Sequence, residues 1–269
     1  MKFFEDLARG AGIFALLAVA DAALYDQTIK IPQGKLQGAA AFNSTSAPST
    51  ISNWKDISVW KGIPYAGTTA GEHRWKPPQS APSWNGTYKA TSFGASCPSQ
   101  SAGDGYSEDC LTINIWSPAT SVNAKLPVMF WSYAAGGESS QSTYDGAGMA
   151  GKDIVFVSYN SRTGPLGWLT LPELEDETGA TGNYGLLDQI AALKWVHENI
   201  AAFGGDPEAI TAAGQSFGSG ASYHILNSPL SKGLIKGVIA ESGIKDPYDP
   251  NMVGYGSDYR NMTWALDFS

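Results

Sequence analysis

The chain has 269 residues, 43% of them hydrophobic and 12% aromatic, a composition typical of one large globular domain and not of a disordered chain. Its 17 basic and 25 acidic side chains give a formal net charge of −8, and no run is rich in Lys and Arg. Because a phosphate backbone is bound through clustered positive charge, we expect no nucleic-acid partner.

The first 23 residues have the pattern of a secretory signal peptide, in which basic residues precede an apolar core at 11–20 and small residues follow it. Glu5 and Asp6 dilute the positive charge, so a short membrane anchor or an amphipathic arm is the alternative. The core is too short for a membrane span, and no later segment offers 18 uncharged apolar residues. We therefore expect a secreted protein without a membrane span, with residues 24–269 as its one domain.

Two further features agree with export. Asn43, Asn85 and Asn261 each begin an Asn-x-Ser/Thr glycosylation sequon, although so short a pattern is weak on its own. The two cysteines, Cys97 and Cys110, could close a small loop as one disulfide in an oxidising compartment. Two buried free thiols are the alternative.

The chain after the leader is predicted to alternate strands and turns. Residues 27–40 read as a strand pair around Gly34, residues 43–53 as a polar surface loop, and residues 58–66 as an extended segment. Five short apolar runs bounded by Gly, Pro, Asp or Asn follow, as expected for strands covered on both faces. They are LTINIW (111–116), LPVMFWSY (126–133), DIVFVSYN (153–160), AITAAG (209–214) and LIKGVIAESG (234–243).

One long helix is predicted between the third and fourth of these runs. Apolar residues recur there at steps of three and four, at Leu186, Ile190, Leu193, Val196 and Ile200. Gly204 and Gly205 end the pattern, and Pro207 follows. Strand, helix and strand in this order indicate a βαβ unit, and hence an α/β fold with a largely parallel central sheet flanked by helices.

Residues 214–218 spell Gly-Gln-Ser-Phe-Gly, a G-x-S-x-G pentapeptide with Ser216 at its centre. In a nucleophile elbow, a strand leads into a sharp turn at the serine and a helix leads out. AITAAG supplies a strand, and residues 217–228 can form a helix whose first N–H groups face a developing oxyanion. An ordinary turn is the alternative reading of the pentapeptide alone.

Six sequence blocks that follow one another in order and span most of the mature chain carry a family resemblance. The sequence resembles the type-B carboxylesterase and lipase family, the cholinesterase-like branch of the α/β-hydrolases, in its N-terminal part. The blocks are SEDCLTINIW (107–116), LPVMFWSYAAGG (126–137), VSYNSRTGPLGWL (157–169), the helix block 182–211, GQSFG (214–218) and IAESG (239–243). The resemblance implies an α/β-hydrolase sheet, Ser216 as the catalytic nucleophile, and a disulfide between Cys97 and Cys110.

The resemblance also implies an oxyanion hole made of backbone N–H groups. By position, Ala135 and Gly136 would donate, together with Phe217, the residue after the nucleophile. The family has glycine where this chain has Ala135, and a Cβ restricts the backbone angles available there. Phe217 stands where a small residue is usual, and its ring would narrow the pocket for the acyl group.

The catalytic base is the main departure from the family pattern. A serine needs a histidine to take its proton and a carboxylate to orient that histidine, and the resemblance places both in a C-terminal part beyond Ser269. The chain's histidines, His73, His197 and His224, do not match the family's catalytic position. Glu241 and Ser242 lie at the end of the strand after the nucleophile helix and are expected to support the site without reacting.

Two other motifs do not withstand inspection. Residues 146–151 spell G-x-G-x-x-G but precede a strand, which is the wrong order for a dinucleotide site, and His197-Glu198 is followed by Ala201 where a zinc motif needs histidine. We expect no cofactor and no metal. The sequence thus favours a secreted serine esterase that acts on a small-molecule or lipid ester. We expect the 269-residue chain alone to have weak esterase activity or none. The alternatives are a non-catalytic, cholinesterase-like interaction domain and a fragmentary gene product.

Overall fold

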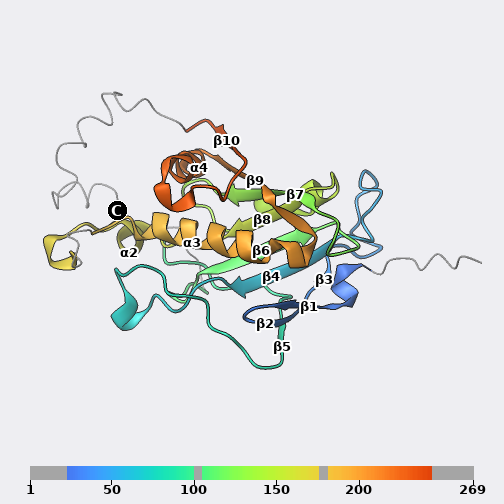
Figure 1. Ribbon diagram of the computed structural model, residues 1–269, viewed down its shortest axis with the longest axis horizontal. Coiled ribbons are helices and arrows are strands. Elements are labelled where there is room, and N and C mark those ends of the chain that lie inside the picture. Colours follow the sequence, from blue (N-terminus) through green and yellow to red (C-terminus); the bar gives the residue numbers. More distant parts are fainter. Residues whose placement is uncertain (1–22, 100–104, 176–180, 244–269) are drawn as a thin grey trace, which may run out of the picture.

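Short apolar runs form a seven-stranded sheet in the computed structural model, which describes residues 23–99, 105–175 and 181–243 (Figure 1). The predicted signal peptide, apart from residue 23, and Asn261 lie outside the described residues. In the order in which they lie in the sheet, the strands are β10 (Gly237–Glu241), β9 (Gly205–Gln215), β7 (Leu126–Ser132), β8 (Val155–Tyr159), β6 (Thr112–Ser117), β4 (Ser58–Pro64) and β3 (Ala39–Ala40).

The sheet has a parallel half and an antiparallel half. Strands β10, β9, β7 and β8 pair in parallel, whereas β6 pairs antiparallel with both β8 and β4, and β4 pairs antiparallel with β3. The predicted α/β fold is confirmed, and the sheet is parallel in the half that carries Ser216. Parallel neighbours need long crossovers, and helices supply them here.

Alternation along the strands gives the sheet two buried faces. On β8, Val155 and Val157 belong to one core cluster, and Phe156 between them belongs to the other. The first cluster includes side chains of α3 (Tyr184–Asn199) and α4 (Phe217–Asn227), and the second includes those of α1 (Ala147–Ala150). All five residues of β8 are buried, as expected for a central strand covered on both faces.

Helix α3 confirms the predicted amphipathic helix. Of the predicted stripe, Ile190, Leu193, Val196 and Ile200 are buried, and Leu186 is half-buried. A 3-10 turn, Ile200–Phe203, continues the helix to Gly204, which has φ 79°. Since a left-handed residue ends a helix most readily when it is glycine, Gly204 explains the stop.

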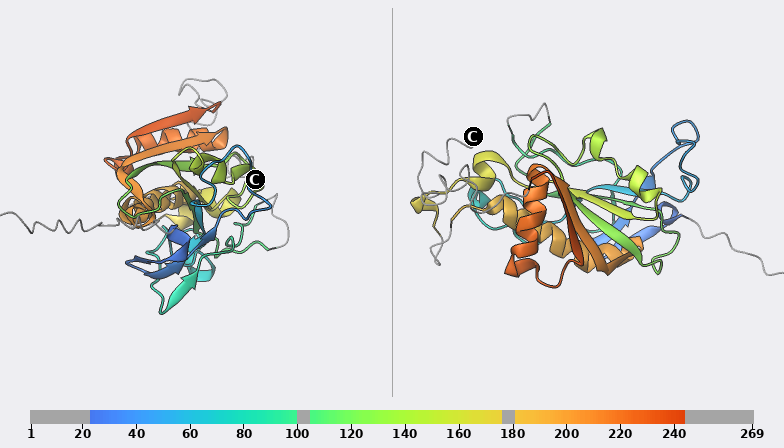
Figure 2. Two further views of the ribbon diagram at one scale, coloured as in Figure 1. Left: turned by 90° about the vertical axis from the view of Figure 1, so that its right-hand side faces the viewer. Right: turned by 90° about the horizontal axis from the view of Figure 1, so that it is seen from above.

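A small second sheet covers the N-terminal edge of the molecule. Strands β1 (Thr28–Ile31) and β2 (Gly34–Gln37) form the predicted antiparallel pair, and β5 (Thr87–Lys89) runs parallel to β2. Figure 2 shows these strands and β10 at opposite ends of the molecule. The remaining described elements are α2 (Gly164–Trp168) and the 3-10 turns Leu24–Asp26, Gly71–His73, Ser142–Tyr144, Pro172–Leu174 and Pro229–Ser231.

None of the helices in the described ranges is both long and apolar enough to cross a membrane.

Candidate active site

Ser216 lies at a strand-to-helix turn with an uncommon backbone conformation. Strand β9 ends at Gln215, α4 begins at Phe217, and Ser216 between them has φ 56° and ψ −117°. A positive φ is rare for a residue with a Cβ and marks a position that its surroundings hold in place. The strand, turn and helix expected of a nucleophile elbow are therefore present around this serine.

The two glycines of the pentapeptide are required by close packing. A Cβ at Gly218 would lie 2.0 Å from the carbonyl oxygen of Ser132, and one at Gly214 would lie 2.3 Å from that of Gly218. Neither position can carry a side chain without moving backbone. The glycines thus let α4 begin directly against the end of β7.

Three parallel strands end together at this turn. Ser132 at the end of β7 is in register with Gly214, and Glu241 at the end of β10 is in register with Gln215. The residues that follow the three strands are therefore neighbours. The open carboxyl edge of parallel strands is where α/β proteins place their ligands.

The predicted oxyanion segment is a tight turn just beyond β7. The N–H of Gly137 donates to the carbonyl of Ala134 at 2.9 Å, and Gly136 has φ 73°. This bond leaves the N–H groups of Ala135 and Gly136 outside the turn, and both residues are exposed. Ala135 keeps a negative φ, so its Cβ conflicts with no backbone angle that this turn requires.

An aromatic pair stands beside Ser216. The ring of Phe217 lies edge-on to that of Trp168 at the end of α2, with centroids 6.0 Å apart. Phe217 remains 38% exposed. Phe217, the large residue next to Ser216, thus packs against the ring of Trp168. We call these two rings the aromatic wall.

Glu241 and Ser242 reach the turn through their backbone. The N–H of Ser216 donates to the carbonyl oxygen of Glu241 at 2.9 Å. The side chains of Glu241 and Ser242 are both exposed, and Ser242 has φ 59°. The contact with Ser216 is therefore made by a peptide carbonyl, with no part for the carboxylate.

All three histidines lie within the described residues, and their ion-pair and ring contacts are with residues other than Ser216. His224 is exposed on α4 and its ring is edge-on to Tyr223; His197 Nε2 lies 3.8 Å from an oxygen of Glu208; and His73 adjoins Glu72. Within the ranges that the structure covers, no hydrogen bond joins a histidine to Ser216.

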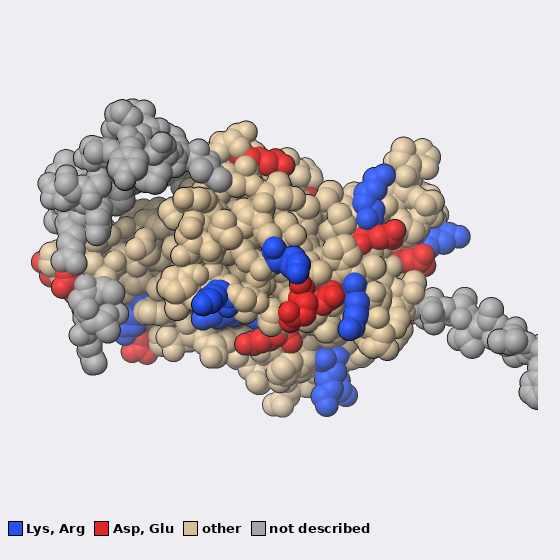
Figure 3. All heavy atoms as spheres, turned by 45° about the horizontal axis from the view of Figure 1, so that its top comes forward, with Lys and Arg blue, Asp and Glu red and all other residues tan. Residues whose placement is uncertain are grey.

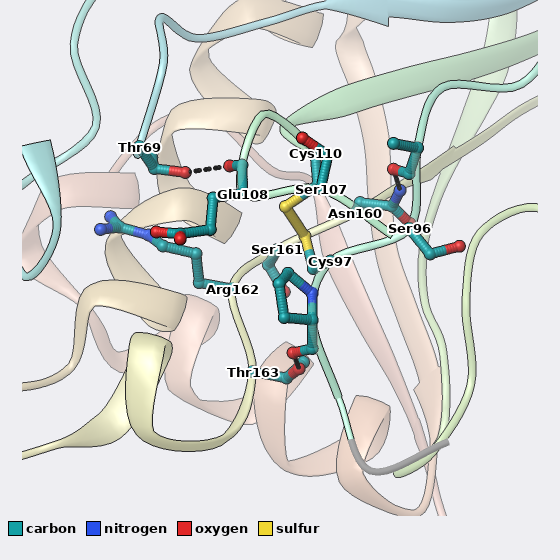
Figure 4. Close-up of a disulfide and its surroundings, with 12 residues drawn as sticks. Thr69, Ser96, Cys97, Ser107, Glu108, Cys110, Asn160, Ser161, Arg162 and Thr163 are labelled. Atoms are coloured by element: carbon teal, nitrogen blue, oxygen red, sulfur yellow. Dashed lines mark hydrogen bonds between the residues drawn. A yellow bond between two sulfur atoms is a disulfide. The ribbon is translucent and has the colours of Figure 1, made fainter. Parts of the chain in front are cut away.

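The predicted disulfide between Cys97 and Cys110 is present, with a Cα–Cα distance of 5.0 Å. Figure 4 shows it beside the segment that follows β8. Thr163 of that segment donates its hydroxyl to the carbonyl of Pro98 at 3.0 Å, and Asn160 donates its amide to that of Ala95 at 3.1 Å. The segment around Cys97 therefore holds the chain just before α2, the helix that ends at Trp168.

A buried ion pair, which the sequence did not reveal, connects the same segment to α3. The guanidinium of Arg162 donates to both carboxylate oxygens of Asp188 at 2.8 and 2.7 Å, and both side chains are almost fully buried. Burial raises the pKa of Asp188, and the hydrogen bonds and charge of Arg162 oppose that rise. The spacing along the helix could have indicated that Asp188 is buried, since it lies four residues from the buried Tyr184 and Ala192 and so on the same face.

Comparisons with known proteins agree on one family. The family model described as "Carboxylesterase family" matches residues 25–254. The fumonisin B1 esterase of Sphingopyxis macrogoltabida is 42% identical over 198 residues, which cover 70% of this chain and 37% of that protein. The para-nitrobenzyl esterase of Bacillus subtilis is 40% identical over 199 residues, with 70% and 40% coverage.

Solved structures give the same result. The carboxylesterase of Geobacillus stearothermophilus superposes with a TM-score of 0.69 at 39% identity, covering 78% of this chain and 42% of that one. A PNB esterase superposes with a TM-score of 0.70 at 36% identity, with 82% and 44% coverage. The chain thus spans less than half the length of the relatives it matches. On its fold, its elbow and these similarities, the chain belongs to the carboxylesterase family.

Proposed function

We propose that residues 24–269 belong to a secreted carboxylic ester hydrolase in which Ser216 is the nucleophile. The observation that carries the proposal is the backbone of Ser216, held at positive φ between β9 and α4. Its oxygen would attack the ester carbonyl carbon, release the alcohol and form an acyl-serine, which water would cleave to the acid. Similarity to esterases and to a bovine bile salt-activated lipase supports an ester as the substrate.

Charge stabilisation would come from backbone N–H groups. Phe217 opens α4, and the first N–H groups of a helix have no partner within it. Ala135 and Gly136 would add two donors from the turn after β7. Such groups stabilise the tetrahedral intermediate when they point at its oxygen.

The reaction also requires a base, which would take the proton from Ser216 and give it to the departing alcohol oxygen. None of His73, His197 and His224 is hydrogen-bonded to that residue in the described chain, so we propose that these 269 residues hydrolyse esters weakly or not at all. The alternative function is a non-catalytic interaction domain of the same fold.

One face of the molecule carries charges of both signs. On the face shown in Figure 3, acidic and basic side chains are interspersed and wide stretches carry no charge. This face therefore has no extended patch of a single sign.

Export is the second part of the proposal. Residues 1–23 would be removed as a signal peptide, and Asn43 and Asn85, both exposed, would be glycosylated. The Oδ1 of Asn43 accepts the Thr45 hydroxyl at 2.7 Å, so the asparagine and threonine of this sequon already face each other. Asn261, the third sequon, lies outside the described residues. Expression in a secreting eukaryotic host, followed by glycosidase treatment, tests the proposal: a mass shift lost in Asn43→Gln and Asn85→Gln supports it, and an unmodified or retained protein contradicts it.

The test of the nucleophile is covalent labelling. The purified chain is treated with a fluorophosphonate and its peptides are mapped by mass spectrometry, alongside Ser216→Ala and the exposed control Ser49→Ala. Labelling of the peptide that holds Ser216, lost only in Ser216→Ala, supports a nucleophile. Turnover of a short aryl ester by the same sample separates an active enzyme from a site that reacts but does not turn over. No labelling at Ser216 would favour the interaction domain.

A further inference from the structure

The turn after β10 contacts the backbone of Ser216. The N–H of Ser216 donates to the carbonyl oxygen of Glu241 at 2.9 Å, and the residue after Glu241, Ser242, has φ 59°. Ser216 and Ser242 thus both have a positive φ, although neither is glycine. Two such residues at the ends of adjacent strands indicate a local arrangement that each side holds in place.

Gly243 closes this contact from the other side. A Cβ at Gly243 would lie 2.1 Å from the carbonyl oxygen of Ser216, 2.9 Å from its carbonyl carbon, and 2.8 Å from the Cβ of Ser219. Two of these atoms are backbone and cannot rotate away as a flexible side chain could. Any residue other than glycine would require the turn or Ser216 to move.

The carbonyl of Ser216 has little freedom to make room. It already accepts the N–H of Ser219 at 3.0 Å and that of Gly220 at 3.2 Å, the bonds that start α4. Moving this oxygen away from a new Cβ would weaken the first turn of the helix. The N–H on one side of Ser216 and the carbonyl on the other are therefore both held, the first by Glu241 and the second by α4.

We propose that Gly243 is a positioning residue for Ser216, an inference that rests on Ser216 being the nucleophile. The missing side chain lets the 241–243 turn close over the Ser216 carbonyl while the Glu241 carbonyl reaches the Ser216 N–H. This closure sets the backbone angles of Ser216 and hence the direction in which its hydroxyl leaves the turn. Gly243 acts through Ser216 and does not touch substrate.

Gly237, the first residue of β10, offers a matched control. A Cβ at Gly237 would meet nothing within 4 Å. The substitutions Gly243→Ala and Gly237→Ala therefore add the same methyl group, the first in the turn after β10 and the second at its first residue, and only the first conflicts with Ser216.

The decisive measurement is hydrogen exchange of the Ser216 amide, followed by NMR, together with the Ser216 Cα chemical shift. In Gly243→Ala we expect exchange at Ser216 to be at least about tenfold faster and the Cα shift to move, because the bond to Glu241 opens locally. The amides of Ile115 and Val157 in the central sheet should keep their protection. Gly237→Ala should match the wild type at all three.

Unchanged protection and an unchanged Cα shift at Ser216 in Gly243→Ala would overturn the inference. Equal loss of protection at Ile115 and Val157 would also overturn it, since that result means general destabilisation. The rate of fluorophosphonate labelling is measured on the same proteins, and about a tenfold decrease in Gly243→Ala is expected from a displaced nucleophile. If the wild type does not label, the proposed function fails, and hydrogen exchange still decides the role of Gly243.

Discussion

Gly218 and Ser132 lie so close that a single methyl group on Gly218 would come within 2.0 Å of the Ser132 carbonyl oxygen. The contact joins the first turn of α4 to the last residue of β7, across the position of Ser216. It places the strand that leads to the predicted oxyanion segment against the helix that leads out of the elbow.

Gly218→Ala should therefore destabilise the fold, whereas Gly220→Ala, two residues further along the same helix, should not. A Cβ at Gly220 meets nothing within 4 Å. We expect a loss of about 1–3 kcal/mol or more for Gly218→Ala from overpacking, and a gain of roughly 0.5–1 kcal/mol for Gly220→Ala from helix propensity. Urea unfolding of the two variants measures both values. Equal stabilities would show that the packing at Ser132 is looser than described.

The aromatic wall of Phe217 and Trp168 should limit the acyl group that reaches Ser216. Removing the ring in Phe217→Ala should raise the labelling rate of a long-chain alkyl fluorophosphonate relative to a short-chain one, by roughly tenfold or more for several methylenes. Leu226→Ala is the control, because Leu226 is an exposed apolar residue of the same helix. A ratio that stays constant in Phe217→Ala would place the acyl site elsewhere.

The Arg162–Asp188 pair should be costly to break from one side. Arg162→Met leaves the buried Asp188 carboxylate without its positively charged partner, for which we expect a loss of about 3–5 kcal/mol in the free energy of unfolding. The double variant Arg162→Met/Asp188→Leu should recover much of this loss, since no buried charge remains. Arg74→Met, at a pair on the surface with Glu108, should have a smaller effect. A double variant no more stable than the single one would show that the pair itself is required.

Removing the disulfide should lower stability through the entropy of the unfolded chain. Cys97 and Cys110 are 13 residues apart, a loop for which the expected loss is about 3 kcal/mol. Thermal unfolding of Cys97→Ser/Cys110→Ser gives the change in melting temperature, and the wild type in a reducing agent should match it. If the reductant also lowers the melting temperature of the double variant, the effect does not arise from this bond.

The sequence alone was sufficient where the signal is local. Short apolar runs bounded by Gly, Pro, Asp or Asn predicted the strands, and the three- and four-residue steps predicted α3. The Gly-Gln-Ser-Phe-Gly pattern between a strand and a helix predicted the turn at Ser216. Each of these features depends on the backbone conformation of one segment, and the spacing of residue types within that segment reveals it. The family resemblance, carried by longer blocks, predicted the fold and the disulfide.

Only the tertiary structure decided which residues from different segments meet. The sequence marks Gly243 and Arg162 no differently from many other glycines and arginines. Their significance comes from Ser216 and Asp188, each 26 or more residues away along the chain. The tertiary structure also decided that Phe217 packs on Trp168, that Ala135 has a negative φ, and that half of the sheet is antiparallel. Strand order and close packing follow from the burial of all segments together, and no single segment carries that information.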